Sequence, residues 1–130
     1  ILVFMLNTRE SKEYKTMPLS IRCAPETQRA VLNKAKRHVD THYLFIGITE
    51  QLPLTIRYLE KVLPSFFKGA TQALSMVAKQ NVDSGDHRSA DLTERTKAIM
   101  RTNPCNYAVI EIYKYIEQLF WKKVKEAGLV

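Results

Sequence analysis

The stretch THYLFIGITEQLPLTIRYLEKVLPSFFKGATQ, residues 41–72, places an apolar run, a turn and an amphipathic segment in close succession. Residues 43–48 are continuously apolar rather than alternating, which favours a strand that is covered on both faces, as in a parallel sheet flanked by helices. Gly47 inside this run predicts a close neighbour. The stretch therefore predicts an α/β fold, mostly helical in this chain, with one or two strands of a parallel sheet.

An amphipathic helix is expected directly after this strand. Thr49 is a suitable N-cap, and Pro53 falls within the first turn, where proline is tolerated. Pro64 ends the helix because proline cannot continue it. The apolar residues between these points repeat at helical spacing: Leu52, Ile56, Leu59 and Leu63.

Three further helices are expected outside the stretch. One of about 14 residues begins with Pro25 in its first turn. A short one is capped by Thr93 or Asp91 and interrupted at Pro104. The last and longest carries a wide apolar stripe and ends near Gly128. The members of this stripe are Val109, Ile112, Tyr113, Ile116, Leu119, Phe120 and Val124.

Length and charge indicate one domain with an anionic partner. The chain has 130 residues, of which 45% are hydrophobic, so residues 1–130 are expected to form a single domain. Twenty Lys and Arg against thirteen Asp and Glu give a net charge of +7, which favours an anionic ligand or surface. Nucleic acid is not expected, because the aromatic residues fall at core spacing and no nucleic-acid motif is present.

The start of the chain carries no recognisable targeting segment. It begins with Ile1 rather than Met, and the apolar run 1–6 is far shorter than the roughly 20 residues that a membrane helix needs. We therefore expect the chain to be part of a longer protein.

The two cysteines, Cys23 and Cys105, are compatible with one disulfide, with two ordinary buried or free thiols, or with a bridge to a partner elsewhere. Ordinary thiols are the default interpretation. No Cys or His spacing predicts a metal site.

A polar loop is the best candidate for ligand contact. Residues 79–91, KQNVDSGDHRSAD, lack apolar periodicity and have a central glycine. Their cations and hydroxyl groups suit phosphate or sulfate oxygens, although a solvated connection would look the same. The candidates are Lys79, Ser84, His87, Arg88 and Ser89.

Other cations and histidines give weaker signals. Lys68 beside Gly69 is a second cationic candidate, and snorkelling beyond the preceding phenylalanines explains it equally well. His38 and His42 lie at the expected end of a helix, where a capping or solvated role is favoured over catalysis. The four glycines are far apart, so no phosphate-binding loop is present.

Residues 23–71 resemble the C-terminal half of the heparan sulfate and dermatan sulfate uronyl 2-O-sulfotransferases. The likeness is closest in GITEQL (47–52), LE (59–60) and LPSFFKGAT (63–71), and it continues more weakly through 107–120. Residues 1–16 match nothing in the family. The resemblance implies that the chain is the C-terminal part of a P-loop-kinase-like sulfotransferase fold.

The resemblance also implies an activity. Such enzymes move the sulfuryl group of 3′-phosphoadenosine 5′-phosphosulfate to the 2-hydroxyl of a uronic acid in a glycosaminoglycan of heparan or dermatan sulfate type. In the family, the catalytic base and the loop that grips the 5′-phosphosulfate lie upstream of the part seen here. No catalytic residue is therefore expected in this chain, and the chain alone is expected to be inactive.

Site residues follow from the same resemblance. It places Lys79, Ser84, His87 and Arg88 near the nucleotide phosphates, and it makes Lys68 a candidate contact for the acceptor. The family has a short-range disulfide at the position of Cys23, but its expected partner is replaced by Met17. Cys23 is then either free or paired with Cys105.

By family resemblance the protein is a Golgi luminal, single-pass type II membrane glycoprotein, anchored by a segment outside this chain and able to form homo-oligomers.

The alternative to a sulfotransferase is a function of a different class. The chain would then be a non-catalytic, basic helical module that binds an acidic polysaccharide.

Overall fold

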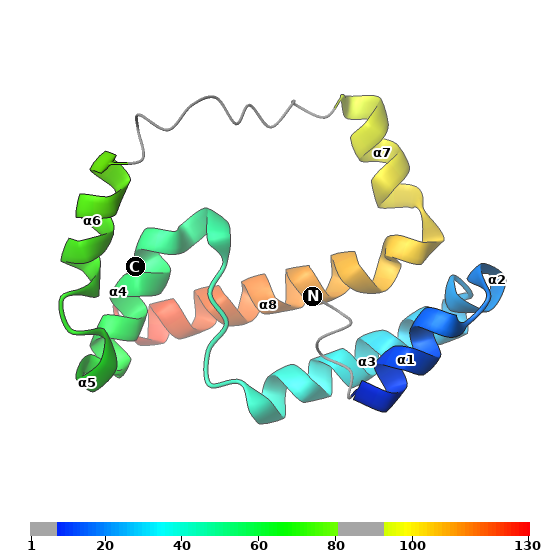
Figure 1. Ribbon diagram of the computed structural model, residues 1–130, viewed down its shortest axis with the longest axis horizontal. Coiled ribbons are helices and arrows are strands. Elements are labelled where there is room, and N and C mark those ends of the chain that lie inside the picture. Colours follow the sequence, from blue (N-terminus) through cyan, green and yellow to red (C-terminus); the bar gives the residue numbers. More distant parts are fainter. Residues whose placement is uncertain (1–7, 81–92) are drawn as a thin grey trace. The chain divides into compact units, whose positions relative to one another are not determined.

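The computed structural model describes residues 8–80 and 93–130, and every regular element within these ranges is helical (Figure 1). The longer helices are α1 (Thr8–Thr16), α3 (Pro25–His42), α4 (Leu52–Val62), α6 (Ala70–Gln80), α7 (Glu94–Thr102) and α8 (Tyr107–Glu126). Two short α-helices and two 3₁₀ turns connect them: α2 (Leu19–Arg22), η2 (Thr49–Gln51), α5 (Pro64–Phe67) and η4 (Pro104–Asn106).

The chain divides into two compact units. Unit 1 contains the described residues 8–44 and 93–117, and unit 2 contains 45–80 and 118–130. Helix α8 contributes its first half to unit 1 and its second half to unit 2. The prediction of a single domain is not decided by this division and stays a prediction.

Unit 1 is built on α3 and the first half of α8. The buried residues of α3 repeat every three or four positions, as do those of α8, so each helix has one apolar face. Fully burying an aliphatic side chain of this size contributes about 1.5 to 3 kcal/mol. The residues of this core are Leu32, Ala35, Val39, Ala108, Ile112 and Ile116.

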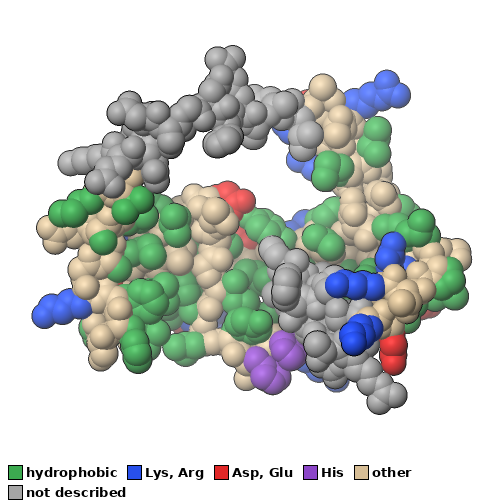
Figure 2. All heavy atoms as spheres, in the orientation of Figure 1, with side chains coloured by type: hydrophobic (Ala, Val, Ile, Leu, Met, Phe, Trp, Pro, Cys, Tyr) green, Lys and Arg blue, Asp and Glu red, His purple; other side chains and the backbone are tan. Residues whose placement is uncertain are grey.

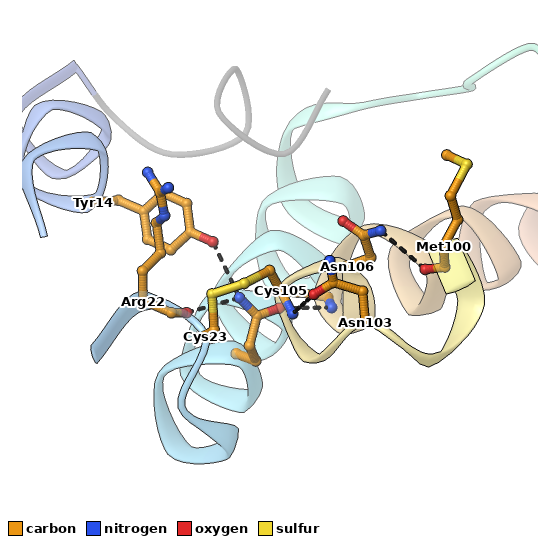
Figure 3. Close-up of a disulfide and its surroundings, with 9 residues drawn as sticks. Tyr14, Arg22, Cys23, Met100, Asn103, Cys105 and Asn106 are labelled. Atoms are coloured by element: carbon orange, nitrogen blue, oxygen red, sulfur yellow. Dashed lines mark hydrogen bonds between the residues drawn. A yellow bond between two sulfur atoms is a disulfide. The ribbon is translucent and has the colours of Figure 1, made fainter. Parts of the chain in front are cut away.

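A disulfide joins the residue that ends α2 to the 3₁₀ turn η4 before α8 (Figure 3). Cys23 is bonded to Cys105, 82 positions away in the sequence, and neither thiol is free. The expectation of ordinary thiols is therefore wrong, and the open alternative of a Cys23–Cys105 bond is confirmed. The side chain of Asn103 accepts a hydrogen bond from the Cys105 amide at 2.9 Å, and Asn106 donates to the Met100 carbonyl at 2.9 Å.

A buried glutamine ties the same region together. The Gln28 side chain is 1% exposed, yet both ends of its amide are bonded. Its nitrogen donates to the Arg22 carbonyl at 2.8 Å and contacts the Tyr14 hydroxyl at 3.2 Å, and its oxygen accepts from the Ala108 amide at 2.9 Å. A buried polar group is tolerated only when it is satisfied in this way. Gln28 thus caps one free amide at the start of α8.

Unit 2 contains α4, α5, α6 and the end of α8, and an aromatic cluster joins α4 to α8. Helix α4 contacts both α5 and α6. Phe45 stacks on Tyr58, with ring centroids 4.0 Å apart, and lies 5.6 Å from the Phe120 ring. Trp121 meets Phe120 edge-on at 5.3 Å. Tyr58 and Phe120 are buried and form the core of the unit, whereas Trp121 is 38% exposed and lies at its edge.

The predicted α/β fold is wrong, since residues 43–48 do not form a strand. Tyr43 is 43% exposed and Leu44 60% exposed, and the described part of the chain holds no strand with which this segment could pair. A strand needs the backbone of a neighbour to satisfy its N–H and C=O groups. The run is apolar because this extended segment packs Phe45 and Ile48 against the helices of unit 2.

Several local predictions are confirmed. A Cβ atom on Gly47 would collide with the Thr55 side chain, which is the predicted close neighbour. Thr93 caps α7 by accepting from the Thr96 amide, and Gly128 adopts a positive φ of 66° just after α8. Thr49 is not the cap of α4, because it lies in η2 and Gln51 precedes the helix. Helices α1, α2, α5 and α6 were not predicted.

Candidate functional site

The structure places one of the predicted site residues, Lys68, in full. Lys79 lies in the last turn of α6, but its side chain falls outside the described residues. Ser84, His87 and Arg88 lie in 81–92, which are also outside them. The predicted co-substrate contacts therefore stay predictions.

Lys68 is held at a tight turn between α5 and α6. Its backbone amide donates to the Pro64 carbonyl at 3.1 Å and closes α5. The next residue, Gly69, has a φ of 82°, a conformation that residues with a Cβ rarely adopt. The Lys68 side chain is exposed, and no carboxylate among the described residues pairs with it. Its ammonium is thus presented to solvent from a defined backbone.

The carboxylate of Glu60, on α4, fixes the far side of this turn. It accepts a hydrogen bond from the Gly69 amide at 2.7 Å, from the Thr71 amide at 3.3 Å and from the Thr71 hydroxyl. The first amides of a helix form a natural anion site. At α6 this site is filled by the chain's own carboxylate, so the segment 60–71 acts as a scaffold that carries Lys68.

These hydrogen bonds change the acidity of Glu60. The Thr71 hydroxyl, followed by the Gly69 amide, lowers the pKa of this carboxyl below its ordinary value. The folded chain therefore binds the Glu60 proton less tightly than the unfolded chain does. The stabilisation that the charged Glu60 carboxylate gives the folded chain is present above the ordinary pKa of the carboxyl. It is lost as the pH falls through the lower pKa of Glu60 in the folded chain.

We expect the change Glu60→Gln to lower the melting temperature at neutral pH, and the difference from the wild type to shrink as the pH falls below 4.5. Thermal unfolding followed by circular dichroism between neutral and acidic pH measures this difference. Glu50→Gln, which changes an exposed carboxylate of η2, is the matched control. A difference that stays constant into the acidic range would show that the charge of Glu60 is not what stabilises the turn.

The histidines of α3 lie at its C-terminal end, as predicted. His38 and His42 stack with ring centroids 4.1 Å apart, and the Thr41 hydroxyl lies 2.6 Å from His42 Nδ1. Figure 2 shows histidine side chains gathered at one place on the surface. The neighbouring carboxylate of Asp40 accepts a hydrogen bond from the Tyr115 hydroxyl at 2.6 Å. That bond, helped by burial, raises the pKa of Tyr115.

Within residues 8–80 and 93–130, no group of three or more His, Cys, Asp and Glu side chains could hold a metal ion. In the same ranges no helix has both the length and the apolar character to cross a membrane. Of the predicted site, the structure thus describes one exposed ammonium, that of Lys68, on the turn that Glu60 holds. Such an ammonium can attract an anionic group.

The hydrogen bonds of Glu60 to the start of α6 were not predicted from the sequence. A carboxylate near the end of one helix, with Gly69 and Thr71 at the start of the next, is not a local pattern that predicts this contact. Capping interactions usually come from within the first turn. Here the acceptor lies nine positions before the first amide, so only the fold brings it there.

Two curated proteins are similar to this chain in sequence. The uronyl 2-sulfotransferase homologue pip of Drosophila melanogaster is 32% identical over 74% of this chain, which covers 18% of that protein. Heparan sulfate 2-O-sulfotransferase 1 of Xenopus laevis is 30% identical over 65% of this chain, which covers 24% of that protein. No family model and no solved structure matches.

The chain thus spans a quarter or less of the length of these curated relatives. Both relatives carry the name of a 2-sulfotransferase, which is the family that the motifs at 47–52 and 63–71 resemble. The resemblance is confirmed: this chain is homologous to these two 2-sulfotransferases over about 70% of its length.

Proposed function

We propose that this chain is part of an enzyme that transfers a sulfuryl group from 3′-phosphoadenosine 5′-phosphosulfate to the 2-hydroxyl of a uronic acid in a glycosaminoglycan of heparan or dermatan sulfate type. The observation that carries the proposal is the sequence relation to two 2-sulfotransferases from different animals. The net charge of +7 supports it, because both the co-substrate and the acceptor polymer are anionic.

The residues have separate roles in this proposal. Lys68 attracts a carboxylate or sulfate group of the acceptor, as its exposed ammonium allows. The co-substrate's phosphates are held by Lys79, Ser84, His87 and Arg88. The base that deprotonates the acceptor hydroxyl and the loop for the 5′-phosphosulfate are supplied by residues outside this chain, so the chain alone does not turn over.

The proposed compartment is the Golgi lumen. The Cys23–Cys105 disulfide supports this, because such bonds form and persist in oxidising compartments and are rare in the cytosol. We further propose that the complete protein is a type II membrane glycoprotein, anchored by a segment outside this chain, and that it forms homo-oligomers.

Ligand binding by the chain tests the proposal. We expect adenosine 3′,5′-bisphosphate to bind in isothermal titration calorimetry, and Arg88→Ala to weaken it about tenfold or more, since a hydrogen bond to a charged group contributes roughly 1.5 to 3 kcal/mol. Lys68→Ala should leave this binding unchanged and weaken retention on immobilised heparin. Arg37→Ala, an exposed arginine of α3, is the control.

A second candidate function is a non-catalytic helical module that binds an acidic polysaccharide. The observation that favours it is that all regular elements of the described ranges are helices. The titration separates the two candidates. Heparin affinity without any bisphosphate binding would support the module and count against the transferase.

A further inference from the structure

We propose that unit 1 carries a second polyanion contact, separate from Lys68: a groove along α7, η4 and the start of α8 that binds a sulfated or carboxylated sugar chain. The choice of a sugar polymer rests on the proposed function. The existence of an anion-binding groove rests on the geometry of unit 1 alone.

Two adjoining hollows form the groove. One, of about 330 Å³, is lined by Arg101, Asn103, Tyr107 and Lys114, among others, and the next, of about 380 Å³, by Lys97 and again Arg101. Arg101 and Ile110 line both, so the two hollows lie next to each other. Concave sites of a few hundred cubic ångströms are the size that takes a small ligand or one residue of a polymer.

A third hollow continues the groove past the disulfide. It is lined by Cys23, Arg29 and Tyr107, among others, and shares Pro104 and Tyr107 with the first. All three hollows lie within unit 1. Three neighbouring hollows along one surface suit a polymer that contacts each in turn better than a single small ligand.

The charge of the lining is mostly positive. Four cations line the three hollows, Arg29, Lys97, Arg101 and Lys114, against a single carboxylate, Glu111. Lys97 is paired with Glu94 on its own helix at 2.9 Å, so the positive excess comes mainly from the two arginines. Glu111 is paired with Lys114 at 2.7 Å, and the Lys114 side chain is still 59% exposed. Arg101 is exposed and has no ion-pair partner among the residues that the structure describes. A guanidinium fork of this kind matches the paired oxygens of a carboxylate or sulfate.

An aromatic ring lines the same hollows as these cations. Tyr107 is 44% exposed and lines two of the hollows. Lys114 follows it by seven positions on α8, or about 10 Å along the helix, so the ring and the ammonium lie on one face. A single exposed ring suits an apolar face of a sugar, whereas a nucleic acid strand would need a series of rings to stack successive bases.

A disulfide and hydrogen bonds hold one side of the groove in place. The disulfide fixes Cys105, the Asn106 side chain ties the turn to the Met100 carbonyl, and Gln28 holds the first turn of α8 (Figure 3). A site that is already formed loses little conformational entropy when its ligand binds. The groove therefore has charge, an aromatic surface and a preformed shape together.

The test compares two double variants of the whole chain with the same change in net charge. Arg101→Ala/Lys114→Ala removes the groove cations, whereas Arg37→Ala/Lys122→Ala removes an exposed arginine of α3 and a lysine that is paired with Glu126 at 4.0 Å. A heparin oligosaccharide is titrated into each without nucleotide. We expect the groove variant to lose about tenfold in affinity and the control less than about twofold.

A third variant, Tyr107→Ser, should weaken the binding of the oligosaccharide and leave the binding of inorganic sulfate unchanged. If the two double variants lose equal affinity for the oligosaccharide at equal melting temperatures, the proposal is overturned, because binding then depends only on net charge. Single-stranded RNA that displaces the oligosaccharide at matched salt would overturn the sugar assignment. All three variants should bind adenosine 3′,5′-bisphosphate as the wild type does. A groove that does not bind the oligosaccharide can therefore be told apart from a chain that does not bind the co-substrate analogue.

Discussion

Removing the Cys23–Cys105 disulfide should lower the free energy of unfolding of the chain by about 4 kcal/mol, because closing a loop of this length restricts the unfolded chain strongly. The two residues are 82 positions apart, so most of the chain lies inside the loop. The double change Cys23→Ser/Cys105→Ser keeps the size of the side chains and removes the bond. Urea unfolding of this variant and of the wild type measures the difference.

A reducing agent provides the control for this prediction. It should lower the stability of the wild type to that of the double variant and leave the variant unchanged. If reduction leaves the urea midpoint of the wild type where it was, the bond does not stabilise the fold. The folded variant should also bind heparin oligosaccharides less tightly, because the turn at Cys105 supports the groove of unit 1.

The second large effect is expected from Phe120→Ala, which should cost about 3 to 5 kcal/mol. Phe120 is 1% exposed and contacts the rings of Phe45 and Trp121, so its removal leaves a cavity in the core of unit 2. Val109→Ala on the same helix is the control, since Val109 is 49% exposed and its truncation should change stability by about 0.5 kcal/mol or less.

The position of the single tryptophan makes this measurement specific. Trp121 packs on Phe120 within unit 2, so its fluorescence reports that unit, while far-ultraviolet circular dichroism reports all helices. Phe120→Ala should move the fluorescence transition to lower urea. If the fluorescence midpoint does not move, Phe120 is not the centre of this core. Separate midpoints for the two probes would show that the units unfold independently.

Helices with one apolar face could be predicted from the sequence. The start of α3 at Pro25 and the stripe of α8 follow from local rules, and buried Ile112, Ile116 and Phe120 lie on the predicted face. The face of α4 could not be predicted in the same way. Leu52 of its leucine stripe is 42% exposed, whereas Thr55 and Tyr58 are buried. Periodicity identifies a helix but not which of several neighbours it packs against.

The missed elements have physical reasons. Helix α1 is polar throughout, so it has no apolar period to detect. Helix α6 begins where Glu60 caps Gly69 and Thr71, a contact that depends on the fold around it. The segment 43–48 is as apolar as a buried strand would be, but only part of it is buried: Phe45 and Ile48 pack on helices, whereas Tyr43 and Leu44 are exposed. An apolar run indicates that a segment has buried side chains. It does not distinguish a strand in a sheet from an extended segment packed on helices.

Less of the candidate site could be predicted. Lys68 was selected as an isolated cation, whereas the turn that carries it is held by Glu60. The groove of unit 1 was not predicted, because Arg101 and Lys114 belong to different helices and meet only in the folded chain. The pairing of Cys23 with Cys105 was likewise left open, since spacing alone does not determine connectivity.

The disulfide also turns residues 23–105 into a covalent ring. A protease that cuts the backbone once inside this ring releases no fragment, because the sulfur bridge still joins the two pieces. All of α4, α5 and α6 lies within the ring, together with the Lys68 turn. In an oxidising compartment the chain therefore tolerates a nick that would divide an unbridged protein in two.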